Sequence, residues 1–160
     1  MITSLRQIKK CQPCKDGWRR ILRGLNKSRE DSELISLGQI ADASSMPDAL
    51  WAIQTLEQQH SECRRLAFAS YSLIRTNCSY VVRKILQNAE QQFTDNESAT
   101  FNELYESAVR FSVSSEDSIA ATVLHPDAHW AARHTAAAVL GRSKTSEQLS
   151  ANLLLIRGLL

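Results

Sequence analysis

Apolar side chains recur along most of this chain at the three- and four-residue spacing of an amphipathic helix. The N-terminal part of the pattern predicts three short helices, with polar breaks at 27–33 and 44–48. Their apolar stripes are Trp18, Ile21, Leu22 and Leu25; Leu34, Ile35, Leu37 and Ile40; and Ala49, Leu50, Ile53 and Leu56. Asp16 and Ser36 are the expected N-caps of the first two helices, and Pro47 suits the first turn of the third.

The longest run of this rhythm predicts a central helix over about 62–90, bent near Thr76-Asn77. Its apolar positions are Leu66, Ala69, Leu73, Ile74, Cys78, Val81, Val82, Ile85 and Leu86. Further helical stripes follow over about 97–160, and Pro126 and Gly141 mark two of the ends. The last stripe consists of Leu149, Leu153, Ile156 and Leu160 on one face.

No alternation of strand period is long enough to predict a sheet. We therefore expect an all-α fold, a single compact bundle of about seven to nine helices over residues 1–160. Within it we expect a basic helical segment at 1–29, short helices at 30–56, the long central helix, and the C-terminal helices.

Composition agrees with a globular helical protein. Apolar residues make up 43% and charged residues 22% of the 160 residues, which argues against wholesale disorder. Five Gly and three Pro are too few for an all-β chain with many tight turns. A domain of ~150 residues buries roughly 70% of the surface of its unfolded chain, so a chain of this length can be stable as a single domain.

Neither a signal peptide nor a membrane span is expected, because no stretch of the chain has the necessary apolar length. The four cysteines are then more typical of reduced thiols than of a disulfide framework. We expect a cytoplasmic protein.

The net charge of +2 conceals an asymmetry. Residues 1–29 contain nine basic side chains and one acidic side chain, Asp16, whereas acidic side chains outnumber basic ones in the rest of the chain. On a helix, Lys15, Arg19, Arg20 and Arg23 lie mainly opposite the first apolar stripe. This basic face could bind an acidic protein or nucleic acid, or it could balance the excess negative charge of the rest of the chain. No aromatic residues interleave with it to stack on bases, so a protein partner is favoured over nucleic acid.

Two short boxes carry a resemblance to a known family. Cys14, Gly17 and Trp18 form a C-x-x-G-W box, and residues 48–51 read D-A-L-W, from Asp48 to Trp51. With the Leu-rich helix before Lys27 and the helix start at Ser36, the chain resembles, over 11–56, an all-α family of bacterial and phage-borne proteins identified as immunity proteins of polymorphic-toxin systems. The chain departs from the family at 44–47, where Ser-Ser-Met-Pro stands in place of Asn-Gly.

That resemblance implies a small binding protein rather than an enzyme. Cys14, Gly17, Trp18, Asp48 and Trp51 are interpreted as structural residues, since the two tryptophans can each bury a large apolar area at a helix start.

Two clusters invite a chemical interpretation. Cys11 and Cys14 with His60 and Cys63 have the residue types of a Cys₃His zinc site, although buried or half-buried thiols are the favoured interpretation. The second cluster is His125, His129 and His134 with Asp127, a candidate for metal binding or acid–base work. It lacks the Glu of an H-E-x-x-H box, and a polar surface is favoured.

Catalysis has no strong candidate in the sequence. It contains no G-x-S-x-G elbow and no Gly-rich phosphate loop, and its carboxylates are scattered. The leading hypothesis is therefore a non-enzymatic, cofactor-free inhibitor that occludes a protein partner such as a toxin domain. The alternatives are a phage protein that blocks a bacterial defence complex, for example an anti-CRISPR inhibitor, and a zinc- or nucleic-acid-binding regulator.

Overall fold

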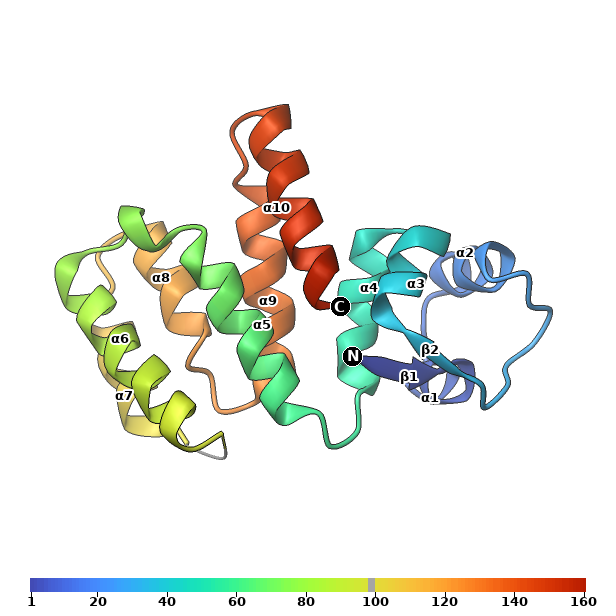
Figure 1. Cartoon of the computed structure of the whole chain (residues 1–160), viewed down its shortest axis with the longest axis horizontal. Coiled ribbons are helices and arrows are strands. Elements are labelled where there is room, and N and C mark those ends of the chain that lie inside the picture. Colours follow the sequence, from blue (N-terminus) through green and yellow to red (C-terminus); the bar gives the residue numbers. More distant parts are fainter. Residues whose placement is uncertain (98–99) are drawn as a thin grey trace.

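Ten α-helices, two short 3₁₀ turns and one two-stranded sheet make up the described part of the computed structural model, residues 1–97 and 100–160 (Figure 1). The α-helices are α1 (Leu5–Lys10), α2 (Lys15–Gly24), α3 (Leu37–Ala43), α4 (Met46–Ala52), α5 (His60–Ser72), α6 (Tyr80–Asp95), α7 (Asn102–Arg110), α8 (Ser115–Thr122), α9 (Ala128–Gly141) and α10 (Ser146–Leu159). The 3₁₀ turns are η1 (Ile53–Thr55) and η2 (Arg75–Asn77). The predicted all-α class is confirmed, with a helix count close to the expected one.

The small sheet corrects the expectation of a chain without strands. Strand β1 (Ile2–Ser4) pairs antiparallel with β2 (Leu34–Ser36), and Thr3 lies opposite Ile35. Each strand has three residues, too few to show an alternation in the sequence. Leu34 and Ile35 therefore precede the helix to which the apolar spacing assigned them. Ser36 is the N-cap of that helix, α3, as predicted, and it forms a capping box with Gln39.

The prediction of one central helix over 62–90 is wrong. The chain forms two helices, α5 and α6, joined by η2. Helix α6 runs back beside α5, and Arg65 in the first half of α5 pairs with Glu97 beyond the end of α6. The bend expected near Thr76-Asn77 is this reversal. Ser79 caps the new helix, because its hydroxyl accepts a hydrogen bond from the backbone N–H of Val82 at 3.4 Å. The apolar rhythm continues across the break because both helices bury an apolar face in the same core.

Buried apolar side chains form two clusters that meet on α5 and α9. The first core joins the N-terminal elements to Leu66 of α5, to one face of α9 that includes Ala132, and to Ile156 of α10. The second core joins the other end of α5 to α6, α7 and α8, and it uses Ala131 and Val139 of α9. Figure 1 shows α5 and α9 side by side in the middle of the molecule, between these two groups of helices.

A buried arginine secures this central pair. Arg64 of α5 donates hydrogen bonds to the backbone carbonyl oxygens of Val123 and His125, the latter at 2.8 Å, where α8 ends and the chain turns into α9. Its guanidinium also lies 5.2 Å from the ring centroid of Phe101. Burial lowers the pKa of Arg64 to about 10, so the side chain is still charged at neutral pH. Carbonyls left without partners at a helix end are well matched to such a cation.

The packing of α2 on α3 requires a glycine. A Cβ atom on Gly24 would lie 1.7 Å from the backbone oxygen of Ala43, a distance that no side-chain adjustment can relieve. The two helix ends therefore approach more closely than any other residue at position 24 allows.

We predict that Gly24→Ala destabilises the protein by roughly 1–3 kcal/mol, because the backbones of α2 and α3 must separate. The matched control is Gly158→Ala in α10, where an added Cβ has no atom within 4 Å. That control should be neutral or stabilising by about 0.5–1 kcal/mol. Chemical denaturation measures both, and equal stabilities of the two variants would contradict the close approach.

Candidate protein-binding groove

The two sequence boxes meet in space at Asp48. The carboxylate of Asp48 in α4 accepts hydrogen bonds from Nε and Nη2 of Arg20 in α2, at 3.0 and 2.8 Å, and another from the Ser44 hydroxyl. Gly17 lies directly beside this pair, since a Cβ there would be 3.2 Å from Asp48 Oδ1 and 3.2 Å from Cys14 Sγ. Asp48 and Gly17 thus fix α2 against α4.

The pKa of Asp48 lies below its usual range. Burial alone would raise it, but hydrogen bonds from Arg20, Ser44 and Ser45, with the charge of Arg20, outweigh that effect. The carboxylate is therefore ionised at neutral pH and holds the half-exposed Arg20 in place.

We predict that Asp48→Asn lowers the free energy of unfolding by roughly 1–2 kcal/mol at neutral pH. A lowered carboxyl pKa stabilises the fold above the ordinary value of about 4, and this contribution disappears as the pH falls through the folded-state pKa. The difference between wild type and variant should therefore narrow in acid. Asp16→Asn is the matched control, because exposed Asp16 has only a 3.7 Å pair with Arg19. Urea denaturation at several pH values from 7 down to about 3 measures the free energy of unfolding of each protein. A difference between wild type and Asp48→Asn that does not change with pH would contradict this account.

Only part of the predicted basic face is free to bind a partner. Lys15, Arg19, Arg20 and Arg23 are all exposed on α2, but Arg20 is bound to Asp48 and Arg19 lies near Asp16. The aromatic ring of α2, half-buried Trp18, contacts a cation from outside this face, because Lys9 Nζ of α1 is 5.1 Å from its ring centroid.

The zinc hypothesis finds no support in the arrangement of its residues. Cys11, Cys14 and His60 are exposed, whereas Cys63 is buried in the first core, where burial raises its pKa to about 12. Over 1–97 and 100–160, no three His, Cys, Asp or Glu side chains are grouped to hold a metal ion. Cys14 instead caps α2, accepting a hydrogen bond from the N–H of Gly17 at 3.3 Å, and Asp16, the predicted cap, lies in the first turn.

The histidine cluster forms ring stacks. His125, Trp130 and His134 follow one another with centroids 4.2 and 4.1 Å apart, and Tyr105 packs edge-on against His125. His129 lies in a different place, where its Nε2 is 2.6 Å from the carbonyl oxygen of Leu56. Asp127 is the N-cap of α9 and accepts from two backbone N–H groups. These contacts give the cluster a packing role and explain the spacing of its members.

An apolar concave surface lies between α4, α9 and α10, with a volume of about 630 Å³. We call it the α4–α9–α10 groove. Its walls include Met46, Leu50 and Trp51 of α4, Leu140 of α9, and Leu149 and Leu153 of α10. Leu50 and Trp51 belong to the D-A-L-W box, so this box both packs against the first core and faces the groove.

One charged residue lines the groove. The side chain of Arg133 in α9 has no ion pair or hydrogen bond with any residue that the structure describes. Leu149, 37% exposed, stands on the opposite wall, and Leu154, 73% exposed, follows on α10. An apolar hollow with one unpaired cation is a surface suited to a ligand that is mostly apolar and carries one negative charge.

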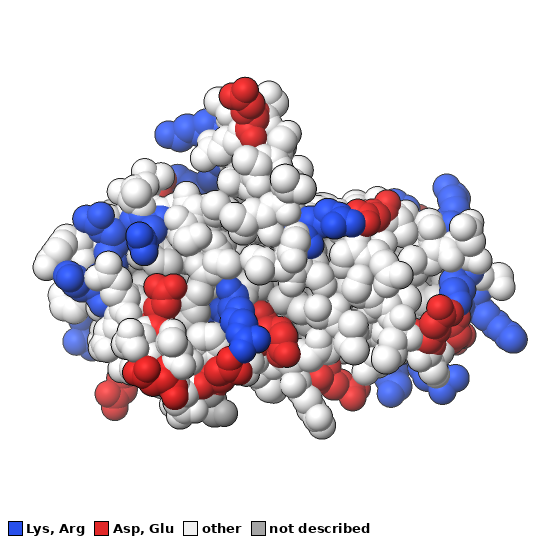
Figure 2. Space-filling model, in the orientation of Figure 1, with Lys and Arg blue, Asp and Glu red and all other residues white. Residues whose placement is uncertain are grey.

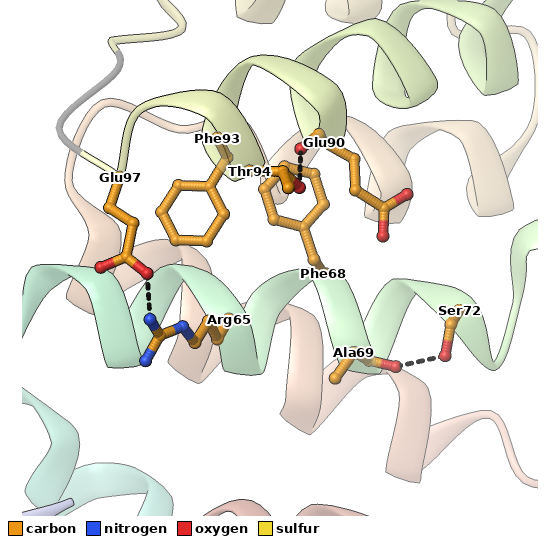
Figure 3. Close-up of a pocket in the computed structure, with 8 residues that line it drawn as sticks. All are labelled: Arg65, Phe68, Ala69, Ser72, Glu90, Phe93, Thr94 and Glu97. Atoms are coloured by element: carbon orange, nitrogen blue, oxygen red, sulfur yellow. Dashed lines mark hydrogen bonds and ion pairs between the residues drawn. The ribbon is translucent and has the colours of Figure 1, made fainter.

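A second hollow lies between α5 and α6 (Figure 3). The rings of Phe68 and Phe93 form its floor, 5.7 Å apart, and the Arg65–Glu97 ion pair closes one end, while Glu90 stands at the other. Both rings are buried parts of the second core, and the Arg65 cation of this hollow is already paired with Glu97. The α4–α9–α10 groove is the stronger candidate for binding.

Sequence reasoning missed this groove because its walls come from three distant segments. It placed Leu149 and Leu153 on one face with Ile156 and Leu160, but only the latter two are buried in the first core. The one local signal was Trp51, a large apolar residue two positions after the buried Ala49.

Comparisons with protein-family models, with curated proteins and with solved structures find no match to this chain. In the described residues, no helix has the length and apolar character needed to cross a membrane.

Proposed function

We propose that this chain is a non-enzymatic, protein-binding inhibitor that neutralises its partner by steric occlusion. The observation that carries the proposal is the α4–α9–α10 groove, whose walls are apolar apart from Arg133. A groove of this kind between helices suits an apolar segment of a partner, since helices commonly bind by laying an apolar face into such a groove.

The occupant we propose is an amphipathic helix of the partner, with one carboxylate placed to reach Arg133. Three features of the groove support this choice. Its volume, about 630 Å³, is large enough to take several apolar side chains from one face of a helix. Trp51 and Leu149 supply the apolar contacts, and aromatic and Arg residues contribute most of the energy in typical interfaces. The guanidinium of Arg133 supplies orientation through a bidentate bond to a carboxylate.

The resemblance to immunity proteins favours a toxin domain as the partner. A component of a bacterial defence complex is the alternative, as for a phage protein that blocks such a complex. Both would use the same groove chemistry, and a cytoplasmic setting suits both.

We predict that Leu149→Asp, which puts a charge into the groove, weakens partner capture by about tenfold or more, a cost of roughly 1.4 kcal/mol or above. Arg133→Glu should have a similar effect because it repels the partner's carboxylate. Val113→Asp is the matched control, since Val113 is 85% exposed and lies outside the groove. Circular dichroism and thermal unfolding check that each variant is folded.

The measurement is quantitative affinity capture from host-cell extract with the wild type and the three variants. A protein retained by wild type and Val113→Asp but lost by both groove variants supports the proposal. Equal capture by all four proteins overturns it. Sedimentation equilibrium of the pure chain tests a different occupant, and a dimer that Leu149→Asp dissociates would show that a second copy fills the groove.

A further inference from the structure

A second charged region lies far along the chain from the N-terminal basic segment. Between Leu66 and Ala89 the sequence has three basic side chains, Arg75, Arg83 and Lys84, and no acidic one. The reversal from α5 into α6 brings these three together around a hollow of about 300 Å³, which Thr76, Tyr80 and Gln87 also line. We call this the basic hollow. Figure 2 shows Lys and Arg side chains gathered at the end of the molecule where η2 and the start of α6 lie.

The three cations of the basic hollow are free to bind an external anion. None of Arg75, Arg83 and Lys84 has an ion pair with a carboxylate in the parts of the chain that the structure describes. Two acidic residues of α8 that lie near Cys78, at this end of the molecule, are already bonded to other groups. Asp117 is buried and accepts the backbone N–H groups of Ser79 and Val113, and Glu116 pairs with Arg142.

An exposed aromatic ring lies among these cations. Tyr80 is 66% exposed, and Lys84 Nζ lies 5.7 Å from its ring centroid. The ring is therefore exposed and next to a cation, which are two properties of a platform for base stacking. The side chains of Thr76 and Gln87 add hydrogen-bonding groups at the same hollow.

We propose that the basic hollow binds single-stranded nucleic acid, with phosphates at Arg75, Arg83 and Lys84 and a base stacked on Tyr80. Binding of single strands combines a positively charged surface with an aromatic platform, and this hollow supplies both. An acidic peptide would use the cations but would leave the exposed ring without a role. The Lys15–Arg23 face of α2 is less suited, since two of its four cations are near carboxylates and its aromatic neighbour is half-buried.

This inference does not depend on the protein-binding proposal. The basic hollow is built from η2 and α6, whereas the α4–α9–α10 groove lies on the other side of the α5–α9 pair (Figure 1). Substitutions in one surface should therefore leave the other unaffected.

The test measures fluorescence anisotropy of labelled oligo-deoxythymidine and oligo-uridine of about ten nucleotides, a length that fits typical single-strand sites. A duplex of the same length and a poly-glutamate peptide are the competing probes. We expect both single strands to bind at low salt. A plot of log Kd against the logarithm of the salt concentration should have a slope of about 2, because each of the three cations contributes roughly 0.7. A preference between the two strands tells whether DNA or RNA is the natural ligand.

Tyr80→Ala should weaken single-strand binding by roughly 5- to 100-fold with little change in the salt slope. The double variant Arg83→Gln/Lys84→Gln should instead reduce the salt slope. The matched control is Lys15→Gln/Arg19→Gln on α2, which should leave binding unchanged. These residues are exposed or, for Arg83, half-exposed, so each variant should fold, and circular dichroism checks it.

Three results would overturn the proposal: no binding of either strand at low salt, tighter binding of the duplex or of poly-glutamate than of the single strands, or loss of binding in the α2 control but not in Tyr80→Ala. The last result would assign the activity to the N-terminal basic face instead.

Discussion

The packing of α5 against α9 is the contact on which the rest of the molecule depends. Alanines at 128, 132 and 136 face the first core and Ala131 faces the second, so these small side chains on two faces of α9 let one helix serve both cores. Arg64 completes the contact, because its guanidinium satisfies carbonyls at the turn between α8 and α9. A lysine has no planar fork of donors and could not satisfy both carbonyls in the same way.

Each candidate surface is a consequence of this central pair. The first core fixes α4 beside α9, and Ile156 packs α10 against the same core. The space left between these three helices is the α4–α9–α10 groove. On the other side, the second core requires the chain to reverse after α5, and the reversal exposes Arg75, Tyr80 and Lys84 together. Both surfaces are therefore built on helices that pack into a core, which favours binding with little ordering cost.

Local signals allowed much of the fold to be predicted, and long-range contacts decided the remainder. The all-α class and the Ser36 cap follow from spacing and capping chemistry within a few residues. The break between α5 and α6 was hidden, because apolar residues keep their rhythm through Leu73, Ile74 and Cys78. The Arg20–Asp48 pair and the groove are each formed by segments that are distant in the sequence. The spacing of apolar residues along the chain does not show which segments come together. The cluster of Arg75, Arg83 and Lys84 was not predicted, because only the fold places these cations around one hollow with Tyr80 among them.

Site-specific photo-crosslinking tests most directly the claim that the α4–α9–α10 groove is the surface that binds the partner. A photoreactive phenylalanine analogue at position 149 lies on the groove wall, and the same analogue at position 113 lies on an exposed turn elsewhere. The account predicts that irradiation in host cells joins one partner protein to position 149 and not to position 113, with the crosslinked partner peptide apolar and carrying a carboxylate. Crosslinking of the same partner at position 113 with none at position 149 would contradict it.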